Sequence, residues 1–265
     1  MRTEITDSER ERFERARKTA LLSWDDKRGA IGIYAEKLLH STLKYFYQED
    51  PMLHEVKLPH GAVADCMADD VAVEIQTGSA YPLARKLTRY RSAGMRVRVV
   101  LPVIARKSVS WMHPETGEVT APRKSPKVGR VYDALRELSF LREYWGEDGI
   151  LFDILLMDVL EYRLLNGWDK SGKRGSRRAE RYPLCLAERY QLGEKADFSL
   201  FVPETLTEPF TAEDYRRQTR LTPLRAGCAV KALYDAQLLD REKQGRSYFY
   251  TRKALLEAQS SLTEE

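Results

Sequence analysis

The chain has 265 residues, 43% of them hydrophobic and 32% charged, which is enough for two ordinary domains with cores of their own. No run of about eighteen apolar residues predicts a membrane span, and the charge-dense N-terminus lacks the apolar segment of a signal peptide. The cysteines Cys66, Cys185 and Cys228 are odd in number and far apart, and no histidine has zinc-site spacing to them. These features argue against a disulfide scaffold and predict a cytoplasmic protein with no membrane partner.

Periodicity and turn residues predict the first elements. Residues 1–20 are charge-dense and predict an exposed helix, and residues 31–47 predict an amphipathic helix that Asp50-Pro51 ends. Gly61 and Asp69-Asp70 are turn signals that separate three short strand candidates. The candidates are residues 54–58, 62–68 and 71–77.

A helix and a strand complete this unit. Gly78 breaks the chain, residues 80–92 predict a helix that Gly94 closes, and residues 96–103 predict a β-rich run ending at Pro102. The order of helix, three-strand meander, helix and strand predicts an α/β (α+β) core over residues 30–103.

The middle of the chain predicts an extension of this core over residues 104–203. Residues 104–127 are polar and basic and predict a loop with a small hairpin at Pro114–Gly117, followed by a helix over 128–144. The apolar run 150–165 fits a strand or a helix, and we favour a strand. We expect it to pair with residues 182–192 across a basic loop at 167–181, and the prolines of residues 194–208 predict a linker.

The C-terminal residues 204–265 predict a second domain. Thr211 can cap a helix that begins at Ala212, and Thr222 with Pro223 can begin another that runs to about Leu238. Residues 240–245 predict a turn and residues 246–251 a strand. The two domains are therefore residues 1–203 and 204–265.

Carboxylates at two predicted strands carry the chemical signal. Asp65 is followed nine residues later by Glu74, and alternation places Gln76 on the same face of its strand as Glu74. Hairpin pairing would bring Asp65 close to Glu74, and two carboxylates suit Mg²⁺ or Mn²⁺. Glu36 lies at the buried stripe of the preceding helix, where a carboxylate needs a partner. The pattern favours catalytic roles for Asp65, Glu74, Gln76 and Glu36, with Asp65 and Glu74 as metal ligands; the alternative is that Asp65 and Glu74 are ordinary strand residues facing solvent.

These residues resemble the PD-(D/E)xK nuclease superfamily over about residues 30–103. Asp65 matches the Asp of the motif, Glu74-x-Gln76 matches its second part with Gln in place of Lys, and Glu36 matches a helical Glu of many members. The segment Lys86-Leu87-x-x-Tyr90 also looks like that superfamily. The resemblance implies a restriction-endonuclease-like αβββαβ core and a metal-dependent nuclease, but Gln76 cannot hold a positive charge against the scissile phosphate.

Residues 210–253 resemble a winged helix-turn-helix domain, with Gly245 at the tip of the wing. The net charge of the whole chain is only +4, but ten Lys or Arg and three acids lie between Arg216 and Lys253. Such a domain reads DNA with a helix in the major groove and contacts phosphates with its wing. The alternative is a winged helix used for protein contacts or dimerisation. The residues that we expect to contact nucleic acid are Lys86, Arg174, Arg225, Lys231, Arg241, Lys243 and Arg246.

Basic residues of the central extension could also follow the phosphates of a strand, with Trp111 and Trp168 stacking on bases, or they could be solvated loop residues. Two functions stay open. One is a metal-dependent DNA endonuclease that the winged helix targets, with duplex DNA favoured over RNA and a homodimer allowed. The other is a non-catalytic DNA-binding regulator or replication-type scaffold on an inactive nuclease fold, which Gln76 favours.

Overall fold

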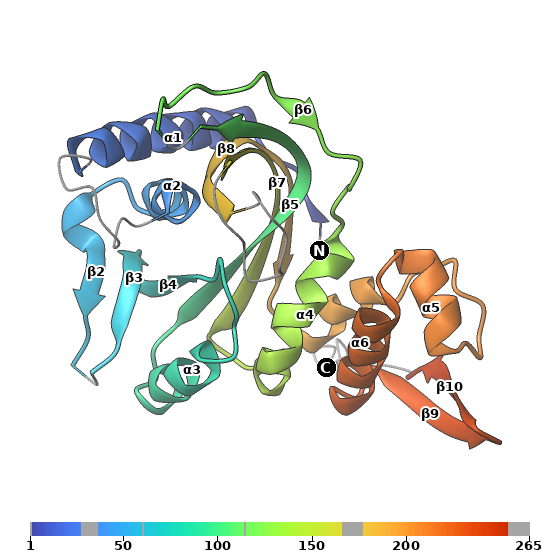
Figure 1. The fold of residues 1–265 in the computed structure, drawn as a ribbon. Helices are drawn as coiled ribbons and strands as arrows, with labels where there is room; N and C mark the ends of the chain where they lie inside the picture. Colours follow the sequence, from blue (N-terminus) through green and yellow to red (C-terminus); the bar gives the residue numbers. More distant parts are fainter. Residues whose placement is uncertain (1, 28–36, 60, 114, 166–176, 254–265) are drawn as a thin grey trace.

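A mixed sheet of eight strands forms the centre of the molecule in a computed structural model that describes residues 2–27, 37–59, 61–113, 115–165 and 177–253 (Figure 1). The strand order is β1-β8-β7-β5-β4-β3-β2, and β6 pairs with β5. These strands are β1 (Arg2–Thr3), β2 (His54–Lys57), β3 (Val63–Ala68), β4 (Val71–Ile75), β5 (Val97–Met112), β6 (Arg123–Lys124), β7 (Ile150–Leu164) and β8 (Arg177–Leu192). Within the described ranges, no helix combines the length and the apolar character that a membrane span requires.

The predicted meander and its flanking elements are confirmed. Strands β2, β3 and β4 pair antiparallel in sequence, and β4 pairs parallel with β5. Asp69 and Asp70 form the tight turn between β3 and β4 with φ angles of 48° and 59°, a conformation that Asp tolerates better than most residues. The helix α3 (Leu83–Ser92) makes the crossover to β5. The element order over this part of the chain is therefore the one that periodicity predicts.

Helices cover both faces of the sheet because its central strands are apolar on both sides. On one face Phe13 of α1 (Asp7–Lys27) and Leu43 of α2 (Leu38–Tyr47) pack against Val73 and Val100. On the other face Leu87 of α3 packs with alternate residues of β5 and β7. The helix predicted from residue 31 begins only at Leu38, because Lys37 before it has an extended backbone, and residues 28–36 lie outside the described part. The helix α1, predicted to be exposed, buries one side.

Strand β5 is much longer than the sequence predicts, and the loop predicted over residues 104–127 is wrong for its first part. The strand continues to Met112 because it pairs parallel with β7 along its whole length. Pro102 does not end the strand. The pairing of β5 with β4 stops at Val100, so Pro102 lies where β5 has no β4 partner and the missing N–H of proline costs little. The predicted pairing of β7 with β8 is confirmed as antiparallel.

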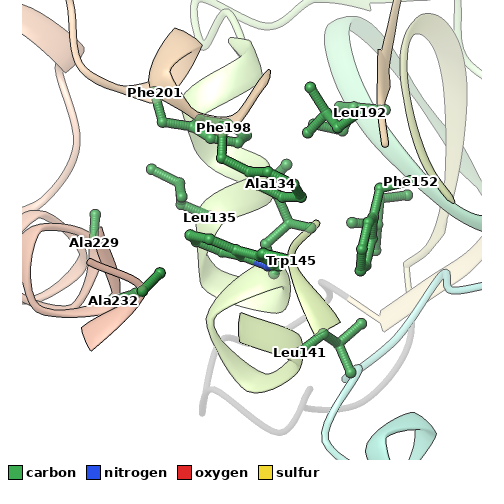
Figure 2. Packing of buried hydrophobic residues seen from close by; sticks show 14 of the residues in the cluster. Ala134, Leu135, Leu141, Trp145, Phe152, Leu192, Phe198, Phe201, Ala229 and Ala232 are labelled. Atoms are coloured by element: carbon green, nitrogen blue, oxygen red, sulfur yellow. The ribbon is translucent and has the colours of Figure 1, made fainter. Parts of the chain in front are cut away.

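Short helical turns follow β6 where one helix was predicted over residues 128–144. They are η2 (Val131–Ala134), α4 (Leu135–Leu138) and η3 (Ser139–Tyr144). The predicted linker at residues 194–208 is wrong, because η4 (Lys195–Phe201) buries Phe198 and Phe201 completely. Figure 2 shows these rings beside Trp145 and Phe152, and Trp145 stacks on Phe198 with ring centroids 4.5 Å apart.

The C-terminal unit contains α5 (Ala212–Thr219), α6 (Pro223–Asp235), β9 (Leu239–Gln244) and β10 (Ser247–Arg252). Thr211 and Asp214 form the capping box of α5. Residues 240–244 belong to a strand and not to the predicted turn, which is confined to the tip around Gly245. Ala229 and Ala232 of α6 face the α4 segment in Figure 2, so this unit shares one apolar core with the sheet.

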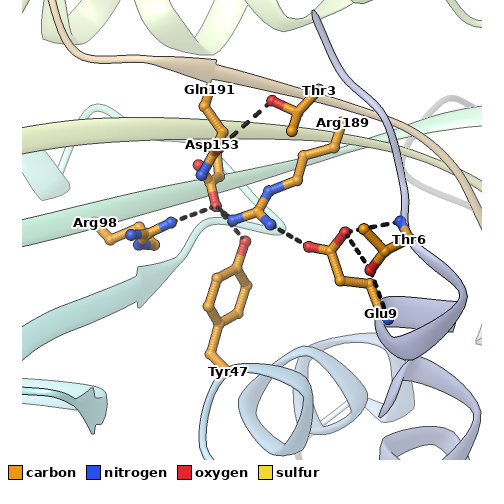
Figure 3. Close-up of polar contacts among 8 residues, drawn as sticks. All are labelled: Thr3, Thr6, Glu9, Tyr47, Arg98, Asp153, Arg189 and Gln191. Atoms are coloured by element: carbon orange, nitrogen blue, oxygen red, sulfur yellow. Dashed lines mark hydrogen bonds and ion pairs between the residues drawn. The ribbon is translucent and has the colours of Figure 1, made fainter. Parts of the chain in front are cut away.

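A buried ion cluster ties the sheet to α1 and α2 (Figure 3). Asp153 of β7 is fully buried, and its Oδ2 accepts hydrogen bonds from Tyr47 at 2.7 Å, Arg98 at 3.0 Å and Arg189 at 2.6 Å. Arg189 also donates to Glu9 of α1 at 2.6 Å. Burial and the charge of Asp153 raise the pKa of the Tyr47 hydroxyl, so it stays a donor. One carboxylate thus holds both helices on this face.

Replacing Asp153 by Asn should destabilise the fold by about 3–5 kcal/mol, because it leaves Arg98 and Arg189 without their buried anion. Urea denaturation of wild type and D153N measures the change. The control is E49Q, which removes only the exposed pair between Glu49 and Arg15 and should leave the midpoint nearly unchanged. A D153N midpoint equal to that of wild type would contradict a role for this cluster in the fold.

Candidate functional site

Asp65 and Glu74 lie on adjacent antiparallel strands, as the spacing predicts. Cys66 of β3 is opposite Val73 of β4, which places Asp65 opposite Glu74 one step along the ladder. Asp65 is also bonded directly to β4, since the backbone N–H of Ile75 donates to its Oδ2 at 2.7 Å. Two carboxylates therefore meet where β4 ends.

Glu74 is almost completely buried and faces α3. Lys86 Nζ lies 2.6 Å from its Oε2, and the hydroxyl of Tyr90 donates to its Oε1 at 2.5 Å. Burial, and next the charge of Asp65, raise the pKa of Glu74 to about 7 although Lys86 opposes the shift. Lys86, predicted to contact nucleic acid, is thus a direct partner of the Glu74 carboxylate.

Asp65 has the opposite electrostatic balance. Burial acts to raise its pKa, but hydrogen bonds from His40 and Ile75 together with the charges of His40 and Lys86 hold the pKa below its ordinary value. His40 Nε2 lies 3.6 Å from Asp65 Oδ1. The sequence analysis missed His40, which lies in the first turn of α2. At neutral pH Asp65 is therefore ionised, whereas the neighbouring Glu74 is easily protonated.

Gln76 follows the end of β4 and makes its hydrogen bonds to nearby backbone groups. Its backbone N–H donates to Val100 of β5 at 2.8 Å, and its side-chain Nε2 donates to the carbonyl of Ser79 at 2.7 Å. The amide therefore holds the loop between β4 and α3. Glu36 lies outside the described residues, so the structure does not place it.

The donor set at this point consists of hard oxygen atoms. The carboxylates of Asp65 and Glu74 could hold a divalent cation together with water or a substrate oxygen, which is a usual Mg²⁺ environment. Burial is the main cause of the raised pKa of Glu74, and a bound cation would favour its ionised form. Within the described ranges, no group of three or more His, Cys, Asp and Glu side chains is arranged to hold a metal.

A groove of about 290 Å³ opens beside Gln76. It is lined by residues 76–78, by the middle of β5, and by Lys107, Lys127, Arg181 and Arg225. Gly129 lies close to the backbone of β5 at one side of the groove. A Cβ at that position would lie 2.0 Å from the carbonyl oxygen of Ile104, so only glycine fits there. Lys107 and Lys127 belong to the basic central extension that could follow the phosphates of a strand, whereas Arg181 was predicted only as the end of a basic loop.

The remaining predicted nucleic-acid residues are spread over the C-terminal unit. Arg225 pairs with Asp133 at 2.9 Å, and Lys231 pairs with Asp235 at 2.6 Å on the exposed side of α6. Arg241 lies over the rings of Tyr234 and Tyr248, with centroid distances of 4.2 and 4.3 Å. Three of these predicted residues line the exposed hairpin of β9 and β10: Arg241, Lys243 and Arg246. Arg174 and Trp168 lie outside the described residues.

Comparisons with known proteins match most of the chain. A family model described as "Domain of unknown function (DUF8091)" matches residues 37–193. An uncharacterized protein of Treponema pallidum (strain Nichols) is 24% identical over 231 residues, which are 84% of this chain and 88% of the relative. No solved structure matches the chain. The family match includes both carboxylates and strands β2 to β8.

The pKa of Glu74 predicts a pH-dependent contribution to stability. The native state holds a proton on Glu74 up to about pH 7, whereas an unfolded Glu releases it near its ordinary value of about 4.5. The contribution is therefore complete below the unfolded pKa and is lost as the pH rises through the folded pKa. The difference in unfolding free energy between wild type and E74Q should fall between about pH 4.5 and pH 7.

Urea denaturation at several pH values measures this difference, and E74Q removes the titration while keeping the shape of the side chain. A difference that rises with pH would mean that Lys86 outweighs burial and the charge of Asp65.

Proposed function

We propose that this chain, which belongs to the DUF8091 family, is a metal-dependent endonuclease that hydrolyses DNA phosphodiester bonds. The observation that carries the proposal is the pair Asp65 and Glu74 on adjacent strands, with Lys86 beside Glu74 and a basic groove at the end of β4. The proposed cofactor is Mg²⁺ or Mn²⁺, held by the two carboxylates. The proposed partner is DNA, with duplex favoured over RNA.

The arrangement of elements supports this proposal. Helix α2, the antiparallel meander β2-β3-β4, helix α3 and the parallel strand β5 follow one another in the order of a restriction-endonuclease-like αβββαβ core. Helices α2 and α3 pack on opposite faces of the sheet. The carboxylates lie toward the carboxyl end of β4, where ligands commonly bind in open α/β sheets.

The residues divide the chemistry between them. Asp65, with its low pKa, stays ionised and is the firmer ligand for a cation. Glu74 has a pKa of about 7, so it can exchange a proton near neutral pH or bind the cation once it is ionised. Lys86 brings the positive charge that Gln76 lacks and can stabilise negative charge on a phosphate. The cation, when bound, lowers the pKa of an attacking water.

The C-terminal unit supports a role in positioning DNA. A three-residue turn of Arg220, Leu221 and Thr222 joins α5 to α6, and the hairpin of β9 and β10 follows. Phe210 forms a bridge to Tyr250 and adds a short third strand position, as in a winged helix. The exposed cations of the hairpin suit phosphate contacts, whereas Lys231 on α6 is partly neutralised by Asp235.

A non-catalytic DNA-binding protein is the second candidate. The observation that favours it is that these side chains already have hydrogen-bond partners within the protein. Gln76 donates to Ser79, and both oxygens of Glu74 accept hydrogen bonds. Cleavage needs the Lys86–Glu74 pair to open for a cation, whereas binding does not. The two candidates therefore differ in their response to metal.

Purified wild-type protein should nick supercoiled plasmid in millimolar Mg²⁺ or Mn²⁺, and D65N should lower the rate by at least about a hundredfold. The reason is that a metal ligand supports several kcal/mol of transition-state stabilisation. D65N keeps an oxygen that can accept from Ile75, so the hairpin should remain. Gel analysis of plasmid conversion measures the rate.

The matched control is D69N, the same change at an exposed turn residue of the same hairpin, which should leave the rate unchanged. The same metals should raise the melting temperature of wild type but not of D65N, since they bind the native site. A melting temperature that neither metal changes, together with the absence of cleavage, would favour the non-catalytic candidate.

Duplex binding should depend on the wing. The double variant K243A/R246A should weaken binding to a labelled duplex and make the plot of log affinity against log salt shallower by about 0.9 for each lost phosphate contact. Anisotropy titrations from low to high salt measure both. K18A changes an exposed Lys of α1 and is the control. An unchanged affinity and slope in the double variant would assign the wing to protein contacts.

A further inference from the structure

The groove beside Gln76 continues toward the C-terminal unit. A second hollow of about 280 Å³ shares Lys127, Asp133 and Arg225 with it and adds Arg130 and Arg220. The two together lead from the end of β4, past the middle of β5, to the start of α6. Cations line the whole path, and the acids that line it have protein partners: Asp133 pairs with Arg225, and Glu137 accepts from the N–H of Ala80 at 2.8 Å.

A buried carboxylate holds some of the cations of the groove in place. Glu161 of β7 is 1% exposed, and three cations from three adjacent strands point to it. Lys107 lies 3.4 Å from Glu161, Arg163 lies 2.6 Å away and Arg181 lies 3.1 Å away. One buried carboxylate therefore orients three cations but balances only one, so two positive charges remain for an external anion.

The titration of the groups around Glu161 agrees with this excess. Burial acts to raise the pKa of Glu161, but hydrogen bonds from Arg163 and Arg181 lower it to about 2. Burial and then the charge of Arg181 lower the pKa of the neighbouring Arg178.

Two exposed aromatic rings lie a few residues from the groove lining: Tyr81 is three residues after Gly78, and Phe140 is three residues after Glu137. Tyr81 is 65% exposed and Phe140 is 40% exposed, and their ring centroids are 5.8 Å apart. They flank the contact between Ala80 and Glu137, and Glu137 lines the groove. Large aromatic side chains in water beside a line of cations are the pairing that single-stranded nucleic acid uses, with bases on rings and phosphates on cations.

We propose that this groove binds a single nucleic-acid strand, with phosphates on Lys107, Lys127, Arg181 and Arg225 and a base stacked on the Tyr81–Phe140 pair. A hollow of this volume admits one sugar-phosphate strand, whereas a duplex must lie on an open surface such as the wing. The inference rests on the proposed nucleic-acid function and gives it a substrate form: the strand reaches the carboxylates unpaired while the winged helix holds adjoining duplex.

Binding of a labelled twelve-residue oligothymidylate tests the groove in EDTA, where no metal can support cleavage. Wild type should bind it, and K127E should weaken binding and flatten its salt dependence by about 0.7 or more, the slope for one phosphate of a single strand. Lys127 is exposed, so the change should not disturb the fold. The matched control K124E makes the same change three residues away, outside the groove, and should bind as wild type does.

The aromatic pair has its own matched variants. Y81A should weaken oligothymidylate binding about tenfold, which is within the range for one stacked base, whereas Y81F keeps the ring and should bind within about twofold of wild type. Equal loss in K127E and K124E, or no loss in Y81A, would overturn the proposal. So would displacement of the oligonucleotide by polyglutamate as readily as by unlabelled oligothymidylate, since the groove would then take an acidic protein segment.

Failure of this inference and failure of the nuclease proposal give different results. Plasmid cleavage that requires Asp65, without oligothymidylate binding in the groove, would keep the nuclease and remove the single-strand site. Groove binding that follows Lys127 and Tyr81, without cleavage in any metal, would keep the single-strand site and remove the catalytic role.

Discussion

The parallel pairing of β5 with both β4 and β7 is the constraint on which the rest of the structure depends. Strand β4 ends at Ile75, but β5 and β7 continue together for another dozen residues beyond Val100. The sheet therefore has a step beside the end of β4, and the groove occupies that step. Because the two long strands are apolar on both faces through their middle, helices must cover them on both sides, and these helices bring His40 and Lys86 to the carboxylates.

The charge distribution uses burial in two different ways. Asp153 and Glu161 are both buried carboxylates of β7, and each gathers cations from neighbouring strands. The cluster at Asp153 is enclosed between the sheet and two helices, so it holds the layers together. The cluster at Glu161 reaches the groove through Lys107 and Arg181, so its surplus charge faces solvent. Glu74 differs from both, because burial raises its pKa to about 7 although Lys86 opposes the shift, and this makes it suited to proton exchange.

The C-terminal unit contributes to this site through its core. Phe198 and Phe201 of η4 fill the space between the sheet, the α4 segment and α6, so that α6 packs against the same apolar cluster as the sheet. Arg225 at the start of α6 is consequently fixed at the groove by its pair with Asp133. The groove beside Gln76 therefore reaches the start of α6 in a fixed geometry, which a flexible linker at residues 194–208 would not provide.

Local patterns in the sequence determined the αβββα order, the opposition of Asp65 to Glu74 and the two C-terminal helices, because turns, caps and alternation act over a few residues. Only the tertiary structure decided where β5 ends, since the residues after Pro102 are extended through their partner β7 and not through their own propensity. It alone decided the partners of Glu74, because Lys86 and Tyr90 come from the crossover helix α3 that packs over β4, and it gathered Lys107, Arg163 and Arg181 around Glu161. Those contacts join residues far apart along the chain, and their energy depends on burial, which no local pattern records.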